Sequence, residues 1–409
     1  MHRQYKHFLL MSNIFNNNRP TSLSNSSQHL KSPNNQPQKL LVAIAIALFT
    51  FGSIVLHPYS WRHSILLIIG GLLGASLYKF RFGFTSTYRK FLTAGEVEGI
   101  YAQLLMLVVA TILFAPVLAA GNVLGEAVKG SIAPIGIQGA IAAFLFGVGM
   151  QIAGGCGCGT LYAVGSGSLA MVFTLLTFCI GSFWASLTRQ FWANLPTLPP
   201  IVLGEKFGWF SGAAIQVGIC LLIFSLIYLK SDRKNQNKLN FSNHFSNCLK
   251  LPLFQGAIAL AILNWLTLIV SGQPWRITWG FALFTAKIAT FFGWDSTNSQ
   301  FWNLPNQQKV LSASLFADMT TVTNIGILLG AFLAAALVGK LSLPAKINPR
   351  IIFSSALGGL LMGYGAFNAF GCNVNAFFGG IASTSLHGWV WIIFALLGSR
   401  LGLILAKLI

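Results

Sequence analysis

Apolar stretches of roughly membrane-crossing length alternate with polar segments along most of the chain. A helix needs about 20 apolar residues to cross a hydrocarbon core about 30 Å thick. The pattern predicts an all-α polytopic membrane protein with a single transmembrane domain over 40–409. The expected spans are 40–57, 64–79, 101–120, 134–153, 168–188, 208–230, 252–272, 322–339, 351–370 and 387–407.

Two polar segments interrupt this pattern. Residues 1–39 are rich in Asn, Ser, Gln and Pro, a composition that cannot bury enough apolar surface to fold alone. We expect them to form a disordered cytosolic tail. Residues 231–250 are polar and basic, and are expected to form a cytosolic loop.

The charge of the chain predicts its orientation. Only 8% of the residues are charged and 55% are hydrophobic, which excludes a soluble globular protein. The net charge of +19 comes mostly from the tail and from 79–100, 230–250 and 340–350. Cytoplasmic connections of membrane proteins carry such an excess of Lys and Arg, so both termini are expected inside a plasma (inner) membrane. Nucleic-acid binding is not expected, because no soluble module carries a basic face.

Two similar glycine-cysteine segments stand out within the apolar pattern. They read AGGCGCGTLYAVGSGS at 153–168 and AFGCNVNAFFGGIASTS at 369–385. Each ends a long apolar run and opens a short second one, as in transporters whose sites are built from broken helices near the middle of the membrane.

The two segments belong to a predicted inverted repeat. Setting Gly147 against Gly363 also pairs Cys156 with Cys372. FGFTSTYRKF at 82–91 resembles WGFALFTAKI at 279–288, and both stretches are too short to span, so they are expected to re-enter from opposite faces. Repeat 1 is placed at about 64–188 and repeat 2 at about 252–407. With the charge-based orientation, the two glycine-cysteine crossings run in opposite directions.

The residue types missing from the spans limit the classes of substrate that the protein is expected to transport. None of the seven acidic residues lies in the middle of a span, which disfavours a cation carrier or a proton relay. Lys287 and Arg400 are the only cations expected within the membrane boundaries. The six cysteines have no zinc-site spacing, and no metal or cofactor is expected.

What remains in the interior suits a small anion. Glycine exposes backbone N–H groups, and a helix that begins there directs its positive end at the site. A neutral thiol is a weak donor that matches a soft sulfur acceptor. Cys158 has no counterpart, because Val374 stands in the matching position, and its role stays open. Lys90 and Lys287 are candidates for gathering anions at the two mouths. The expected substrate-path residues are Gln151, Gly155, Cys156, Gly157, Tyr162, Gly371, Cys372, Asn373 and Asn375.

Three motifs resemble the YeeE/YedE family of sulfur-transport membrane proteins, especially its thiosulfate transporters. They are FGFTSTYRKFLTAG with AQLLML, AGGCGCGTLYAVGSG, and GYGAFNAFGCNVNAFFGGIASTSLHGWVW. The resemblance covers roughly 40–409 and implies a fold pinched at its middle, where Cys156 and Cys372 pass thiosulfate along through S–H···S contacts. A further family cysteine falls near Thr85, and Phe367 and Ala163 stand where the family often has Arg. The resemblance also implies a small cytosolic sulfur-carrier protein as a partner.

The expected function is therefore uptake of thiosulfate or a similar sulfur anion across the lipid bilayer, without enzymatic activity. Two alternatives stay open. One is an intramembrane sulfurtransferase that works through a cysteine persulfide. The other is a membrane subunit that anchors a sulfur-handling complex.

Overall fold

A computed structural model describes residues 36–232, 251–341 and 348–409. Most of the expected tail and of the expected loop at 231–250, with Cys248, lies outside the described residues.

The described chain is built from helices. The first half contains α2 (Lys39–Leu56), α3 (Trp61–Phe80), α4 (Phe84–Ala94), α5 (Glu98–Ala120), α6 (Ile137–Ala153), α7 (Gly157–Gly165) and α8 (Leu169–Leu187). The connection to the second half contains the short helices α9 (Arg189–Ala193) and α10 (Leu203–Phe207). The second half contains α11 (Trp209–Asp232), α13 (Pro252–Ser271), α14 (Thr278–Phe291), α15 (Pro305–Ser312), α16 (Met319–Leu337), α17 (Pro349–Asn368), α18 (Gly380–Ala382) and α19 (His387–Leu405).

Other elements are short. The π-helix η3 (Asn373–Gly379) precedes α18, and the 3₁₀ turns η1 (Ser296–Asn298) and η2 (Leu315–Ala317) flank α15. β1 (Asn122–Val123) pairs antiparallel with β2 (Glu126–Ala127), with Asn122 opposite Ala127. β3 (Ile135–Gly136) pairs antiparallel with β4 (Thr197–Leu198), with Ile135 opposite Leu198.

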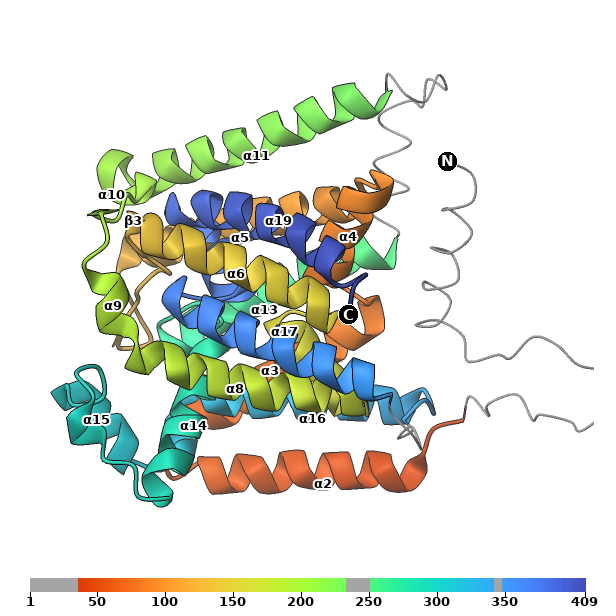
Figure 1. The fold of residues 1–409 in the computed structure, drawn as a ribbon, viewed down its shortest axis with the longest axis vertical. Helices are drawn as coiled ribbons and strands as arrows, with labels where there is room; N and C mark the ends of the chain where they lie inside the picture. The colour runs from red at the N-terminus through yellow and green to blue at the C-terminus, as the bar shows by residue number, and fades with distance from the viewer. Residues whose placement is uncertain (1–35, 233–250, 342–347) are drawn as a thin grey trace, which may run out of the picture. The chain divides into compact units, whose positions relative to one another are not determined.

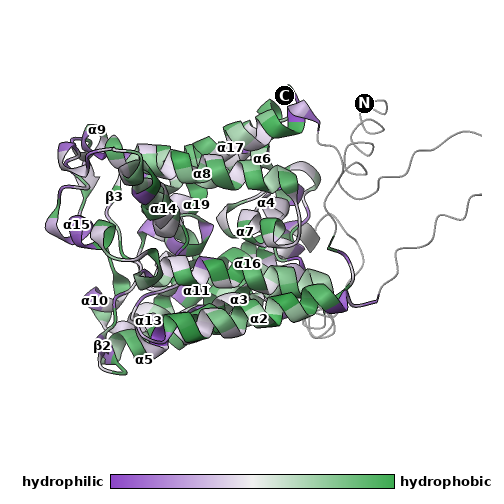
Figure 2. Ribbon diagram, turned by 90° about the horizontal axis from the view of Figure 1, so that it is seen from below, coloured by the Kyte–Doolittle hydropathy of each residue, from purple (hydrophilic) through white to green (hydrophobic). Residues whose placement is uncertain are grey.

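These elements confirm the predicted fold class. Ten helical segments of the described chain are long and apolar enough to cross a membrane. Eight of them have bounds within a few residues of the expected stretches, because hydrophobic length largely determines where such helices form. The segments Trp61–Ala94 and Ile137–Gly165 extend well past 64–79 and 134–153, since each includes a second, shorter helix. Figure 2 shows apolar residues along the helices and polar residues mostly at their ends and connections. Figure 1 shows α9, α10 and α15 at one end of the helices and the C-terminus at the other.

Both glycine-cysteine segments interrupt a crossing. α6 ends at Ala153 and is followed by Gly154, whose φ of +76° is left-handed, and α7 begins after Cys156. α17 ends at Asn368, and Gly371 has a φ of +148°, a conformation open to glycine but strained for other residues. The chain then enters η3 directly after Cys372. Neither the π-helix nor its length follows from the apolar pattern.

The packing of the two halves is reciprocal. α17 packs against α8, and correspondingly α6 packs against α19. α16 packs against α3 and α2, while α5 packs against α13 and α11. α6 and α17 also pack against each other, as do α3 and α13. The fourth and ninth spans, which contain α6 and α17, run in opposite directions if every span crosses the membrane, as an inverted repeat requires.

Matched glycines allow this close packing. A Cβ atom at Gly147 of α6 would collide with the carbonyl oxygen of Ala395 on α19. A Cβ atom at Gly363 of α17 would collide in the same way with the carbonyl oxygen of Phe178 on α8. Helices in lipid associate largely through such close van der Waals contact, which small residues permit. The pairing of Gly147 with Gly363 thus appears as two equivalent helix contacts.

Candidate functional site

Three buried thiols gather where the broken helices of the two halves meet. Cys156 immediately precedes α7, Cys158 lies in its first turn and Cys372 immediately precedes η3. Their exposed fractions are 1%, 1% and 0%. The Sγ atoms of Cys156 and Cys158 are 3.5 Å apart, and the Cys372 thiol interacts electrostatically with both.

Gly157 provides the space for this cluster. A Cβ atom added to Gly157 would lie 3.4 Å from the Sγ atom of Cys372, in van der Waals contact. The glycine therefore brings Cys372 against the backbone between the other two cysteines. Gly155 is buried in the same turn, where a Cβ atom would lie 3.2 Å from the Sδ atom of Met171. Larger side chains at either position would widen or block the junction.

A threonine hydroxyl accompanies a cysteine of each half. Thr85, near the start of α4, interacts with Cys156, and Thr278, the first residue of α14, interacts with Cys372. Both side chains are buried, yet neither hydroxyl makes a hydrogen bond of normal geometry with a described residue. Each hydroxyl therefore has only the neighbouring thiol as a partner, and it can turn to a ligand that binds between the halves. Thr278 was not among the residues expected from the sequence.

Gln151 joins α6 to α4. Its Nε2 donates to the carbonyl oxygen of Thr85 at 3.3 Å, and its Oε1 accepts from Arg89 Nε at 3.2 Å. The Nη2 of Arg89 also donates to the backbone oxygen of Gln151 at 3.2 Å. Gln151 thus positions Thr85 beside Cys156. Arg89 and the buried Arg62 also lie within the apolar helical segment 61–94. That Lys287 and Arg400 are the only cations within the membrane boundaries stays a prediction.

The two asparagines after Cys372 have different surroundings. Asn373 is fully buried, its Nδ2 donates to the hydroxyl of Tyr88 at 3.4 Å, and its Oδ1 has no partner among the described residues. The Nδ2 of Asn375 donates to the carbonyl oxygen of Phe370 at 2.8 Å, and its Oδ1 accepts from Ser131 at 3.0 Å. Asn373 thus binds Tyr88, which lies near Cys156 and Cys158. Asn375 instead stabilises the turn that contains Gly371.

The remaining expected residues are Tyr162, near the thiols, and two lysines that bind other groups of the protein. Tyr162 is half-buried on α7 and interacts electrostatically with Cys156 and Cys158. Lys90 is exposed and forms an ion pair with Glu96 at 3.0 Å. Lys287 donates to the carbonyl oxygens of Leu311 and Ala313. Their assignment to the mouths of the path stays a prediction.

The chemistry available at the cluster is that of thiols, hydroxyls and amides. In the described part of the chain, no group of three or more His, Cys, Asp or Glu side chains is arranged to hold a metal ion. The cluster can donate weak hydrogen bonds from sulfur and stronger ones from hydroxyls and amides. Thiols can also act as nucleophiles after deprotonation.

Fold and site together define a polytopic helical membrane protein whose two halves each contribute a broken helix to a buried thiol cluster. The chain belongs to the sulphur transport family, which it matches over residues 79–401. The family resemblance expected from the three motifs is thereby confirmed.

Two named relatives align with most of the chain, and a third aligns with a shorter part of it. The chain is 26% identical to the thiosulfate transporter TsuA of Spirochaeta thermophila, over 81% of this chain and 96% of that protein. It is 25% identical to the thiosulfate transporter TsuA of Escherichia coli, over 81% of this chain and 91% of that protein. Over 36% of the chain, it is 28% identical to the probable transporter YedE of Escherichia coli, covering 35% of that protein.

Proposed function

We propose that the protein transports a small sulfur-containing anion, thiosulfate first of all, through the thiol cluster. The observation that carries this proposal is the meeting of Cys156, Cys158 and Cys372, supplied by both halves of the fold. The names of the two TsuA relatives support the same cargo.

The cluster suits passage of a thiosulfate-like ion. Neutral thiols donate weak hydrogen bonds to the terminal sulfur, while the free hydroxyls of Thr85 and Thr278 donate to the oxyanion end. Weak contacts at successive positions favour conduction, because the ion must leave each position as well as reach it. The beginnings of α7 and η3 add the partial positive charge of a helix N-terminus.

The proposed orientation of the protein in the membrane rests on the distribution of charge along the chain. The excess of Lys and Arg in the tail and in three connections supports a cytoplasmic position for both termini in a plasma membrane. Uptake would then deliver the anion to a cytosolic consumer, for which a small sulfur-carrier protein is the proposed partner. Alkaline phosphatase fused after Ile409 should be inactive if the C-terminus is cytoplasmic, and activity would overturn this orientation.

The direct test is uptake of labelled thiosulfate into liposomes that contain the purified protein. Cys156→Ala and Cys372→Ala should each lower the rate at least about tenfold, because a contact made during passage is lost. Cys220→Ala is the matched control, since Cys220 is equally buried but lies inside the ordinary helix α11. Wild-type rates in both cluster variants would overturn the proposed path. Sulfite, sulfate and selenium analogues in the same assay would define the cargo.

The 3.5 Å separation of two thiols favours a second candidate function, intramembrane sulfur transfer. The Cys156 thiolate would attack the outer sulfur of thiosulfate, forming a persulfide as the S–S bond breaks and sulfite leaves with the electron pair. Mass spectrometry after incubation with labelled thiosulfate separates the two functions, because a pure conduit leaves no sulfur on cysteine. Transport by the purified protein alone would argue against a mainly anchoring role.

A further inference from the structure

A polar cavity of about 450 Å³ lies among residues of the second half of the chain. It opens among the end of α13, the chain leading into α14 and the start of α16. Its lining includes Ser271, Gln273, Arg276, Trp279, Gln307 and Asp318. By the charge-based orientation, this Arg276 cavity faces the exterior, opposite to the termini.

Arg276 makes no hydrogen bond or ion pair with the described residues of the cavity wall. It is partly buried, its Nε has no hydrogen-bond partner among the described residues, and no ion pair is formed there. Burial lowers the pKa of the Arg276 guanidinium, and the charge of Asp318 opposes this shift. The guanidinium nevertheless stays protonated, since arginine keeps its charge in proteins. A partly desolvated cation without a hydrogen-bonding partner is costly unless a ligand supplies one.

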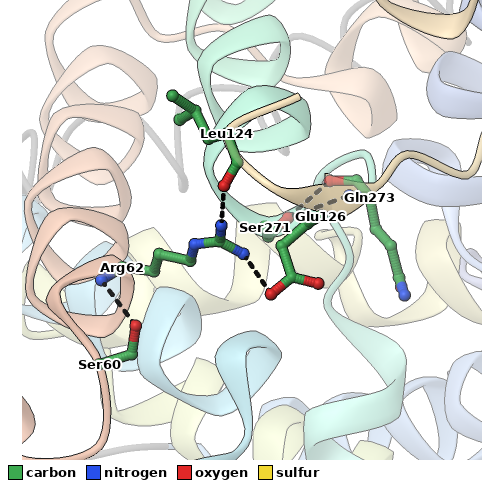
Figure 3. A network of polar contacts seen from close by, with 6 residues as sticks. All are labelled: Ser60, Arg62, Leu124, Glu126, Ser271 and Gln273. Carbon is green, nitrogen blue, oxygen red and sulfur yellow. Dashed lines mark hydrogen bonds and ion pairs between the residues drawn. The ribbon is translucent and has the colours of Figure 1, made fainter. Parts of the chain in front are cut away.

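The two other arginines of the described chain that are not exposed, Arg62 and Arg89, both contact polar groups of the protein. Figure 3 shows Arg62 bonded to Glu126 and to the carbonyl oxygen of Leu124, at 2.7 and 2.6 Å. Arg89 bonds to the side chain and to the backbone oxygen of Gln151. The absence of such a contact distinguishes Arg276.

The nearby acids do not neutralise Arg276 directly. The carboxylate of Glu126 is bound by Arg62, and Figure 3 shows the Gln273 side chain extending away from that pair. Asp318 caps α16: its Oδ2 accepts from the backbone N–H and hydroxyl of Thr321, both at 2.8 Å. Its Oδ1 accepts from Trp279 Nε1 at 3.1 Å. These donors and the helix N-terminus offset the negative charge of Asp318.

The cavity connects to the thiols along the chain. Arg276 precedes Thr278 by two residues, and Thr278 interacts with Cys372. Pro274 lines the cavity and also lies near Gly379, the last residue of η3. An anion held by Arg276 would therefore lie near the end of η3, the element that begins directly after Cys372.

We infer that the Arg276 cavity is a binding site for a small tetrahedral oxyanion, in which the Arg276 guanidinium holds the oxygens before the anion reaches Cys372. The inference rests on the proposed function only for the identity of the transported anion. A planar guanidinium suits this ligand, because its N–H groups donate in parallel to two oxygens.

The test is calorimetric titration of the purified, detergent-solubilised protein with sodium thiosulfate and sodium sulfate at constant ionic strength. Arg276→Gln should raise the dissociation constant about tenfold to a hundredfold, the effect of losing a charge-assisted hydrogen bond. Arg276→Lys, which keeps the charge but loses the fork of donors, should bind with intermediate affinity. Arg350→Gln, which changes an exposed arginine at the start of α17, is the control and should bind as the wild type.

Folding is checked by gel filtration and by thermal melting without the anion. Arg276→Gln should elute as the wild type and melt no lower, because an unpaired charge has been removed. Unchanged affinity in a folded Arg276→Gln protein overturns the inference. Loss of binding in the Gln variant together with a lower melting temperature and wild-type affinity in Arg276→Lys would show a structural role instead.

The same variants separate this inference from the proposed function. Cys372→Ala should lower the transport rate at least about tenfold but keep binding within about threefold, since no cysteine lines the Arg276 cavity. If liposomes transport nothing while binding still depends on Arg276, the cavity site stands and the transport function fails. If Arg276→Gln transports thiosulfate with an unchanged KM, the transport function stands and the cavity inference fails.

Discussion

The thiol of Cys158 lies 3.5 Å from that of Cys156, although the repeat supplies no counterpart for Cys158 in the second half. The cluster is therefore asymmetric, with two thiols from the first half and one from the second. We expect Cys158→Ala to lower the rate of thiosulfate uptake about two- to tenfold, the effect of one lost neutral hydrogen bond. Cys158→Ser should recover part of that rate, because the hydroxyl restores a donor. Uptake by Cys158→Ala at the wild-type rate would show that only the symmetric pair matters.

The free hydroxyl of Thr278 predicts a role in binding the cargo. Thr278→Val keeps the approximate volume and removes the donor, so the KM for thiosulfate should rise about two- to tenfold. Thr285→Val is the control on the same helix, since the Thr285 hydroxyl bonds to the carbonyl oxygen of Phe281 within α14. Equal KM values for Thr278→Val and the wild type would remove Thr278 from the path.

Arg89 and Gln151 should act as a coupled pair. Each single alanine substitution breaks the contacts that hold α4 on α6 and position Thr85. The double variant should therefore lose much less than the sum of the two single effects, with a coupling of about 0.5–3 kcal/mol in the transport rate. Ser86→Ala, at an exposed position of α4, provides the comparison. Strict additivity of Arg89→Ala and Gln151→Ala would contradict this pairing.

The glycines at the helix contacts predict a loss of stability. Gly147→Ala and Gly363→Ala each force a methyl group against a backbone carbonyl, which should cost about 1–3 kcal/mol and lower the melting temperature in detergent. Gly218→Ala on α11 is the matched control, because a Cβ atom there would meet no other atom within 4 Å. Alanine has the higher helix propensity, so this control should be neutral or slightly stabilising. Equal melting of all three variants would show that the contacts relax without cost.

The Arg62–Glu126 ion pair predicts a second difference in stability. The Arg62 side chain is only 8% exposed, so Glu126→Gln leaves a poorly hydrated cation without its partner and should lower stability by about 1–3 kcal/mol. Glu96→Gln breaks the Lys90–Glu96 pair, in which both side chains are more than half exposed. Its effect should stay within about 0.5 kcal/mol, as for most exposed pairs. Similar melting of the two variants would contradict this distinction.

The spans and the two helix breaks could be predicted from the sequence because they depend on local properties. Apolar length determines where helices cross, and the glycines at 154 and 371 adopt backbone conformations that end a helix. The pairing of Gly147 with Gly363 also followed from the sequence, because both halves use the same contact.

The surroundings of the thiols could not be predicted in the same way. Arg89 lies in a helix whose charges mark it as a connection in a hydropathy profile, and only tertiary packing brings it to Gln151. The contact of Cys158 with Cys156 depends on the fold of the first turn of α7, and the repeat offers no counterpart from which to predict it. Arg276 and Asp318 are far apart in the sequence, and only folding brings them to one cavity.

The packing of α6 against α17 and α19 also limits when the protein can assemble during its synthesis. A ribosome delivers α6 to the bilayer long before α19, the helix whose backbone contacts Gly147. Until the last helix inserts, the surface around Gly147 must be covered by lipid or by the insertion machinery. Membrane insertion can therefore proceed helix by helix, but assembly of the thiol cluster must wait for the end of translation.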